Sequence, residues 1–187
     1  MVSKENLLVT KRNGRGKESL NIEKIHSMVG FATEGITGVS ASHVEMNSGI
    51  QFFDGVSTAD IQQILIKSAN DLISLENPNY QYVAARLLLF QLRKQLFHRL
   101  WDHPKFVDHI KSLIDKGLYD KDILVNYDES EIDRMGMWVD HERDYNFTYA
   151  GLRQVMDKYL VQDRSTGDIF ETPQFMYMMI SATLFAQ

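Results

Sequence analysis

Two clusters of basic side chains have the types and spacing that phosphate chemistry needs. Lys11 and Arg12 end a β-prone run, and Lys94 ends a long apolar helical pattern. An ammonium and a guanidinium group both suit phosphate oxygens. Thr58, at a predicted helix start, would add a hydroxyl and a helix N-terminus. From the residues alone, a polyphosphate site and a solvated charged surface both remain open.

A glycine-rich phosphate loop is excluded. The sequence Gly-Arg-Gly-Lys at 14–17 contains the Gly-Lys pair of a Walker loop, but Lys11 stands where that loop needs its first glycine. Glu18 stands where the loop needs Ser or Thr. Side chains must therefore form any phosphate cradle in this chain.

Catalytic and metal-binding constellations are missing from the sequence. Its 6 histidines show no His-x-x-x-His or His-Glu-x-x-His spacing, and there is no cysteine. We find no nucleophile paired with a base. The run His-Glu-Arg-Asp at 141–144 is predicted to be a capping or salt-bridge cluster. We therefore assign no catalytic residue and no metal ligand.

Composition narrows the class of protein. With 187 residues and 44% hydrophobic content, the chain can bury one large core or two small ones. A net charge of −5 argues against a general nucleic-acid binder. The first residues lack the apolar core of a signal peptide, and no apolar run reaches transmembrane length. We expect a soluble cytoplasmic protein with neither a nucleic-acid nor a membrane partner.

The basic pair at 11–12 is predicted to lie on a β-hairpin. Residues 7–12 are β-prone, Asn13-Gly14 is a turn signal, and a second strand follows near 17–21. Asn21 is placed to cap a helix that ends at Gly35. Ser40 or Ser42 would cap the next helix, which carries Val44 to Phe53, and a turn follows at residues 54–55.

Lys94 is predicted to lie on a central helix. Residues 57–60 read as an N-cap with an acidic first turn, and Asn77-Pro78 breaks the helix that follows. The run 80–100 is apolar on most faces, as in the middle of a bundle. The first hundred residues are thus mainly α, with a small β cap on about four helices.

The second half reads as short helices at 104–116 and 129–140, a helix ending at Tyr159, and a hairpin turning at 165–167. Thr172-Pro173 begins a last helix. From Phe175 to Ala186, 10 of 12 residues are apolar, so we expect a covering layer from further polypeptide or from another chain. The alternative is a helix tucked into its own domain.

Strings along the whole chain resemble class Ia ribonucleotide reductase large subunits. Those resembling the ATP-cone are 7–14, 23–26, Asp54-Gly55 with Thr58, Pro-Asn-Tyr-Gln-Tyr-Val-Ala-Ala-Arg at 78–86, and Arg93-Lys94. Those resembling the region before the reductase barrel are 119–120, 141–144, 147–149, 158–161 and 166–175. The resemblance implies an ATP-cone over 1–98, a β-hairpin cap on a four-helix bundle. The helical, incomplete start of the reductase α/β barrel domain would follow over 99–187.

The resemblance also implies a function. The cone is the family's overall-activity site, where ATP activates and dATP inhibits by changing how the large subunit associates with itself and with the small radical-generating subunit. We therefore expect ATP or dATP as effector, together with Mg²⁺. The expected partners are the remainder of the large subunit, the small subunit and further copies of the chain. The family's catalytic cysteines lie further along, so this chain alone would not reduce a ribonucleotide.

Seven residues match the family's nucleotide contacts: Lys11, Arg12, Glu18, Asn21, Lys24, Thr58 and Lys94. The segment 18–24 as a whole lies where the family's base and ribose contacts run. The resemblance assigns phosphates to Lys11, Arg12, Thr58 and Lys94. It assigns sugar and base to Glu18, Ser19, Leu20, Asn21, Ile22, Glu23 and Lys24. The hairpin has one extra residue near 15–17, and glutamines 62 and 91 stand where the family often has histidine, which predicts weaker inhibition by dATP.

Two other functions compete with this one. A stand-alone nucleotide-binding regulator would associate with reductase chains without catalysis, and gel filtration with a candidate partner would separate it from the first hypothesis. A nucleotide-dependent transcription repressor also uses an ATP-cone. It would need a cysteine zinc ribbon, which this sequence lacks.

Overall fold

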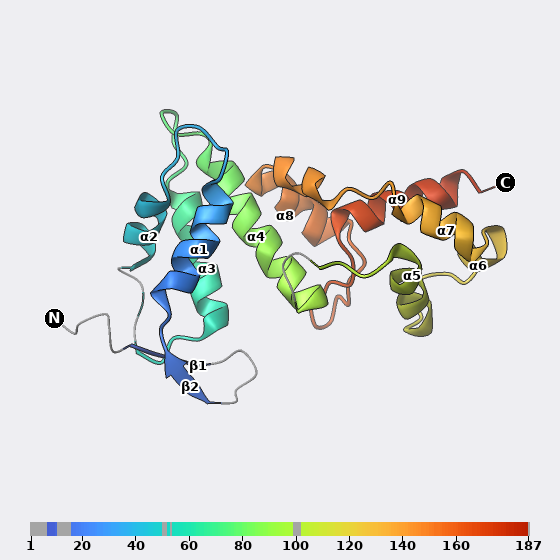
Figure 1. The fold of residues 1–187 in the computed structure, drawn as a ribbon, viewed down its shortest axis with the longest axis horizontal. Coiled ribbons are helices and arrows are strands. Elements are labelled where there is room, and N and C mark those ends of the chain that lie inside the picture. The colour runs from blue at the N-terminus through green and yellow to red at the C-terminus, as the bar shows by residue number, and fades with distance from the viewer. Residues whose placement is uncertain (1–6, 11–15, 50–51, 53, 99–101, 187) are drawn as a thin grey trace. The chain divides into compact units, whose positions relative to one another are not determined.

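The computed structural model describes residues 7–10, 16–49, 52, 54–98 and 102–186. Its regular elements are one antiparallel two-stranded hairpin near the N-terminus and a series of helices (Figure 1). They form two compact units, Met1–Leu88 with Phe147–Ala150, and Leu89–Asn146 with Gly151–Gln187. The predicted fold class, mainly α with a small β cap, is confirmed.

The hairpin pairs β1 (Leu8–Thr10) with β2 (Lys17–Ser19), with Val9 opposite Glu18. The other edge of β1 binds the loop before the third helix: the Thr10 amide donates to the Val56 carbonyl at 3.0 Å. Gly55 in this loop has a φ of +85°, a conformation that glycine adopts without strain. Both the hairpin and the turn at 54–55 are confirmed, and the turn residues Asn13-Gly14 lie outside the described residues.

The first unit is a helical bundle with this hairpin at one end. It contains α1 (Ile22–Thr33), α2 (Ala41–Gly49), α3 (Thr58–Asp71) and the first part of α4 (Tyr80–Phe97). Figure 1 shows α1, α2 and α3 beside one another, with the hairpin near the first residues of α1 and α3. Among the described residues of this unit, the apolar side chains without any exposed surface are Val29, Ala32, Val44, Leu65, Ala69, Val83, Ala84 and Leu87. They come from all four helices, so α4 is central to the core, as its sequence predicted.

Two predicted helices are too long, and one of them, predicted over 129–140, ends at Gly136. Helix α2 was expected to continue to Phe53, but it ends at Gly49, and Phe52 is not helical. Residues 50, 51 and 53 lie outside the described residues. Glycine is the poorest helix former except proline, which explains an end at this position.

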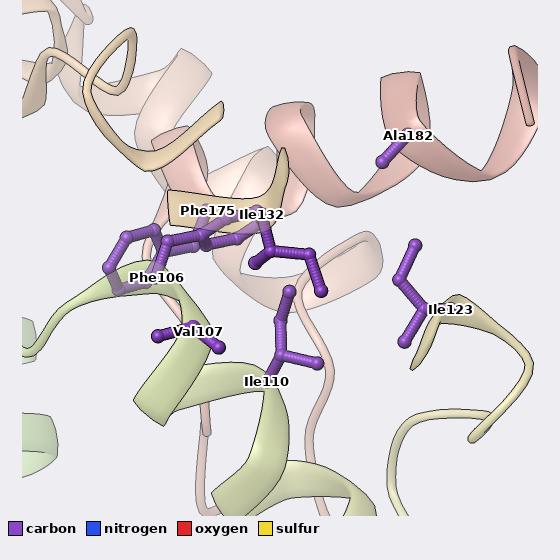
Figure 2. Close-up of a cluster of buried hydrophobic side chains, with 7 residues drawn as sticks. All are labelled: Phe106, Val107, Ile110, Ile123, Ile132, Phe175 and Ala182. Carbon is purple, nitrogen blue, oxygen red and sulfur yellow. The ribbon is translucent and has the colours of Figure 1, made fainter. Parts of the chain in front are cut away.

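The second unit is built from short helices. They are α5 (Phe106–Asp115), α6 (Ile123–Asn126), α7 (Glu129–Gly136), the 3-10 helix η2 (His141–Asn146), most of α8 (Tyr149–Lys158) and α9 (Pro173–Leu184). Figure 2 shows the apolar core that joins α5, α6, α7 and α9, formed by Phe106, Val107, Ile110, Ile123, Ile132, Phe175 and Ala182. The sequence predicted four of these elements and missed α6 and η2.

The expected hairpin over 160–171 is reduced to a single bridge between Gln162 and Ile169. A tight turn still closes it, because the Gly167 amide donates to the Asp163 carbonyl at 2.7 Å. Thr172 caps α9 by accepting from the Phe175 amide, with Pro173 in the first turn, as predicted.

Helix α9 is buried on one side and exposed on the other. Phe175, Met176 and Ala182 are buried, whereas Tyr177, Ile180 and Leu184 share an exposed face. No helix in the described part of the chain combines the length and the apolar character needed to cross a bilayer.

Candidate nucleotide-binding site

The segment predicted to contact sugar and base runs from β2 into the first turn of α1. Glu18 pairs with Val9 in the hairpin and is half-buried. Leu20 is half-buried, and its amide donates to the Leu7 carbonyl at 2.8 Å. The other predicted residues, Ser19, Asn21, Ile22, Glu23 and Lys24, are exposed. Most of this segment therefore presents its side chains to solvent, where a ligand can reach them.

Asn21 caps the N-terminus of α1. Its Oδ1 accepts a hydrogen bond from the Lys24 amide at 2.9 Å, which is the N-cap that the sequence predicted. The cap starts the helix immediately after the hairpin. The exposed side chains of residues 21–24 consequently lie around the N-terminus of α1, where the helix dipole favours negative charge.

Thr58 is the first residue of α3 and is half-buried. Ser57 caps this helix: its Oγ accepts from the Asp60 amide at 3.0 Å and donates to Asp60 Oδ2 at 2.6 Å. This capping box places a carboxylate at the same helix end. A phosphate at Thr58 would share the positive end of the helix dipole with Asp60, so it also needs cationic side chains.

The hairpin supplies the chain segment that carries those cations. Thr10 forms a parallel bridge with Ser57, and its hydroxyl donates to the Gly55 carbonyl at 3.3 Å. The residue that directly precedes Lys11 in the sequence is thus held at the N-terminus of α3. Lys11 and Arg12 themselves lie outside the described residues, and their role stays a prediction.

Lys94 lies in the last turn of α4 and is half-buried. It belongs to the second compact unit, whereas the predicted contacts at 18–24 and Thr58 belong to the first. Its role as a phosphate contact stays a prediction.

The two glutamines that depart from the family pattern have different surroundings. Gln62 is buried inside the bundle, where its Nε2 donates to the Leu87 carbonyl of α4 at 2.8 Å. Gln91 is half-buried on α4. The buried bond gives the Gln62 amide a structural task within the bundle, which the sequence alone did not indicate.

Two histidines of the first unit pair with neighbouring helices. His26 Nδ1 lies 2.8 Å from Glu45 Oε1, and His43 Nδ1 lies 3.3 Å from the Tyr80 hydroxyl. Among the described residues, no group of three or more His, Cys, Asp or Glu side chains is arranged to hold a metal ion.

The second unit contains a buried polar cluster whose pairing the sequence did not predict. Arg93 and Asp144 are almost fully buried, and Arg93 Nη2 lies 3.8 Å from Asp144 Oδ2. The one sequence feature that could have indicated this cluster is the position of Arg93, directly after the apolar run of α4. Arg143 Nε also lies 3.6 Å from Asp140 Oδ2, so the His-Glu-Arg-Asp run takes part in ion pairs, as the predicted salt-bridge cluster requires.

Comparison with known proteins agrees with this arrangement. Residues 7–95 match the family model described as "ATP cone domain", and residues 145–187 match the one described as "Ribonucleotide reductase, all-alpha domain". The first model spans the hairpin and nearly all of α1 to α4. The second begins in η2 and includes α8 and α9.

Curated relatives match almost the whole chain. "Ribonucleoside-diphosphate reductase subunit alpha" of Buchnera aphidicola subsp. Acyrthosiphon pisum is 47% identical over 184 residues, which is 98% of this chain and 24% of that protein. "Ribonucleoside-diphosphate reductase 1 subunit alpha" of Escherichia coli K12 is 46% identical over 182 residues, 97% of this chain and 24% of that protein. The subunit alpha of Enterobacteria phage T4 is 42% identical over 167 residues, 89% and 22% respectively.

The chain thus spans 24% of the length of the first two relatives, and the matched part is their N-terminal region. The second family model and the relatives all name a ribonucleotide reductase. The chain belongs to the ribonucleotide reductase large-subunit family, within which it corresponds to the N-terminal region with the ATP cone.

Proposed function

We propose that residues 1–98 bind ATP or dATP and that this binding regulates the overall activity of a ribonucleoside-diphosphate reductase. The observation that carries the proposal is the bridge between Thr10 and Ser57. It holds the chain directly before Lys11 at the N-terminus of α3, in a segment that matches the ATP cone. Phosphates would bind Lys11, Arg12, Thr58 and Lys94, and sugar and base would bind the segment 18–24.

Mg²⁺ would arrive with the nucleotide. The ion prefers phosphate oxygens and water over an all-protein cage. The described residues offer no cluster of carboxylates or imidazoles to hold it on their own. The protein's contribution is therefore the cationic and hydroxyl side chains that bind the phosphates.

Residues 99–187 would begin the catalytic domain of the large subunit. The chain has no cysteine, so it supplies no thiol for the reduction. We propose the rest of the large subunit, the small radical-generating subunit and further copies of the chain as its partners, and the cytoplasm as its location. Nucleotide binding would act by changing these associations.

Titration calorimetry on the 187-residue chain tests nucleotide binding. ATP and dATP with Mg²⁺ should each release or absorb heat at saturating concentration. A variant with Lys11→Ala and Arg12→Ala should lose that signal, because two charge-assisted phosphate contacts are removed. Lys67→Ala, an exposed lysine of α3 paired with Asp71, is the matched control and should bind as the original chain does. No heat from either nucleotide would refute the proposal.

A further inference from the structure

The last two turns of α4 hold the 3-10 helix η2 through one buried arginine. Arg93 is 2% exposed; its Nη1 donates to the Tyr145 hydroxyl at 2.9 Å and its Nη2 donates to the His141 carbonyl at 2.6 Å. The guanidinium carbon also lies 5.0 Å from the centroid of the Tyr145 ring. These contacts tie the position of η2 to that of Arg93.

The 3-10 helix η2 in turn holds the start of α9. Asp144 Oδ1 accepts a hydrogen bond from Gln174 Nε2 at 2.9 Å, and Gln174 is the second residue of α9. The His141 ring packs edge-on against Phe175, with ring centroids 4.7 Å apart. Phe175 belongs to the core of the second unit (Figure 2). Contacts thus run without a break from Arg93 through η2 to α9.

The ion pair at the centre of this chain of contacts is open. Arg93 Nη2 and Asp144 Oδ2 are 3.8 Å apart, too far for a hydrogen bond. Within the described part of the chain, neither Arg93 Nε nor Asp144 Oδ2 has a hydrogen-bond partner, although both atoms are buried. An approach of about 1 Å would form a direct charge-assisted bond and satisfy Oδ2. A second, closed arrangement is therefore within reach.

The open pair leaves the carboxylate poorly compensated. Burial raises the pKa of Asp144 to about 6, while Gln174 and Arg93 only partly oppose this effect. A direct guanidinium bond would favour the ionised form further. The two arrangements consequently differ in how well they stabilise the ionised carboxylate, and a ligand that favours one of them shifts the balance between the two.

Lys94 directly follows Arg93 in α4, within the same helical turn. We propose that Arg93 and Asp144 are positioning residues that transmit nucleotide occupancy from Lys94 to α9, by shifting their ion pair from the open to the closed arrangement. This inference rests on the proposed function, because it takes Lys94 as a phosphate contact. It adds the route by which the bound nucleotide reaches the start of the all-alpha domain.

Amide hydrogen exchange on the 187-residue chain tests the route, with MgATP as the probe and calorimetry as the measure of binding. In the original chain, MgATP should change exchange in residues 141–146 and 173–184 about fivefold or more, a usual size of allosteric coupling. Asp144→Asn removes the ion pair but keeps an oxygen for Gln174. It should keep the heat of binding and lose the exchange response in α9.

Two further variants separate transmission from simple destabilisation. Gln174→Leu keeps the ion pair and removes its hydrogen bond to α9, while the packing of His141 on Phe175 remains. The response should therefore remain in 141–146 and fall in 173–184. Asp157→Asn, on an exposed carboxylate of α8 paired with Arg153 at 3.0 Å, is the matched control and should respond like the original chain.

The possible failures are distinguishable. Heat of binding in the original chain without any exchange change in 141–146 and 173–184 would overturn the route and leave the proposed function standing. A full response in Asp144→Asn would overturn it as well. Absence of heat in the original chain would instead refute nucleotide binding, and the route with it.

Discussion

At the scale of single residues, three histidines of the second unit are shielded from water: His109 is buried, and His103 and His141 are half-buried. The rings of His103 and His141 stack with centroids 3.7 Å apart, and His109 packs on Phe175 at 4.5 Å. Burial lowers the pKa of His103 and of His109 to about 4 and that of His141 to about 3. The nearby positive charges of Arg93 and Lys116 lower these pKa values further.

These histidines should make the second unit sensitive to acid. Below about pH 6.5 the unfolded chain takes up protons that the folded chain does not bind, so the free energy of unfolding falls as pH drops toward 4. Asp144, whose folded pKa is raised, acts in the opposite direction below pH 6. His109→Phe should remove up to about 1.4 kcal/mol per pH unit from the slope between pH 6.5 and 4.

Urea unfolding of both proteins at several pH values measures this slope. Phe97→Leu is the control, because it alters the same aromatic cluster without removing a titratable group. It should lower stability at every pH and keep the slope. Equal slopes for His109→Phe and the original chain would show that His109 takes up its proton while folded.

At the scale of elements, the sequence predicted the features that depend on near neighbours. Asn21, Ser57 and Thr172 cap helices through residues three positions away, so their patterns are visible in the sequence. The apolar faces of α4 identified the central helix for the same reason. Helix α6 was missed because four residues carry too little periodicity to be recognised.

The candidate site was less predictable than the fold. Glu18 and Lys24 were named as nucleotide contacts only through a family resemblance, since no local pattern marks a cradle built from separate elements. The pairing of Arg93 with Asp144 and the bond from Gln62 to α4 join residues far apart in sequence. Only the folded chain brings such groups together, so propensity and spacing cannot reveal them.

Asn21 has two predicted tasks, capping α1 and contacting the nucleotide, and substitutions can separate them. Asn21→Ala removes the cap and should lower stability by about 1 kcal/mol. Asn21→Ser keeps a capping oxygen and should therefore be nearly as stable as the original chain. It still lacks the side-chain amide that would contact the nucleotide. Thermal melts give stability and calorimetry with ATP gives affinity. If Asn21→Ser binds ATP as the original chain does, the residue acts on binding only through the cap.

At the scale of the whole molecule, the chain has two compact units with separate cores. Two glycines allow each unit to be perturbed alone. A Cβ at Gly136, the last residue of α7, would lie 3.0 Å from Phe106 Cβ, whereas a Cβ at Gly30 in α1 would meet nothing within 4 Å. The same substitution, Gly to Ala, should therefore have opposite effects at the two positions.

Gly136→Ala should destabilise the second unit by about 1 kcal/mol, because overpacking against buried Phe106 exceeds the gain in helix propensity. Gly30→Ala should stabilise the first unit by roughly 0.5–1 kcal/mol through reduced backbone entropy. Amide exchange in low denaturant measures the free energy of opening of each unit separately. Gly136→Ala should speed amide exchange in α5 and α7 and leave the exchange rates in α1 to α3 unchanged. Gly30→Ala should slow amide exchange in α1 to α3 alone. A change throughout the chain in either variant would show that both units unfold as one cooperative body.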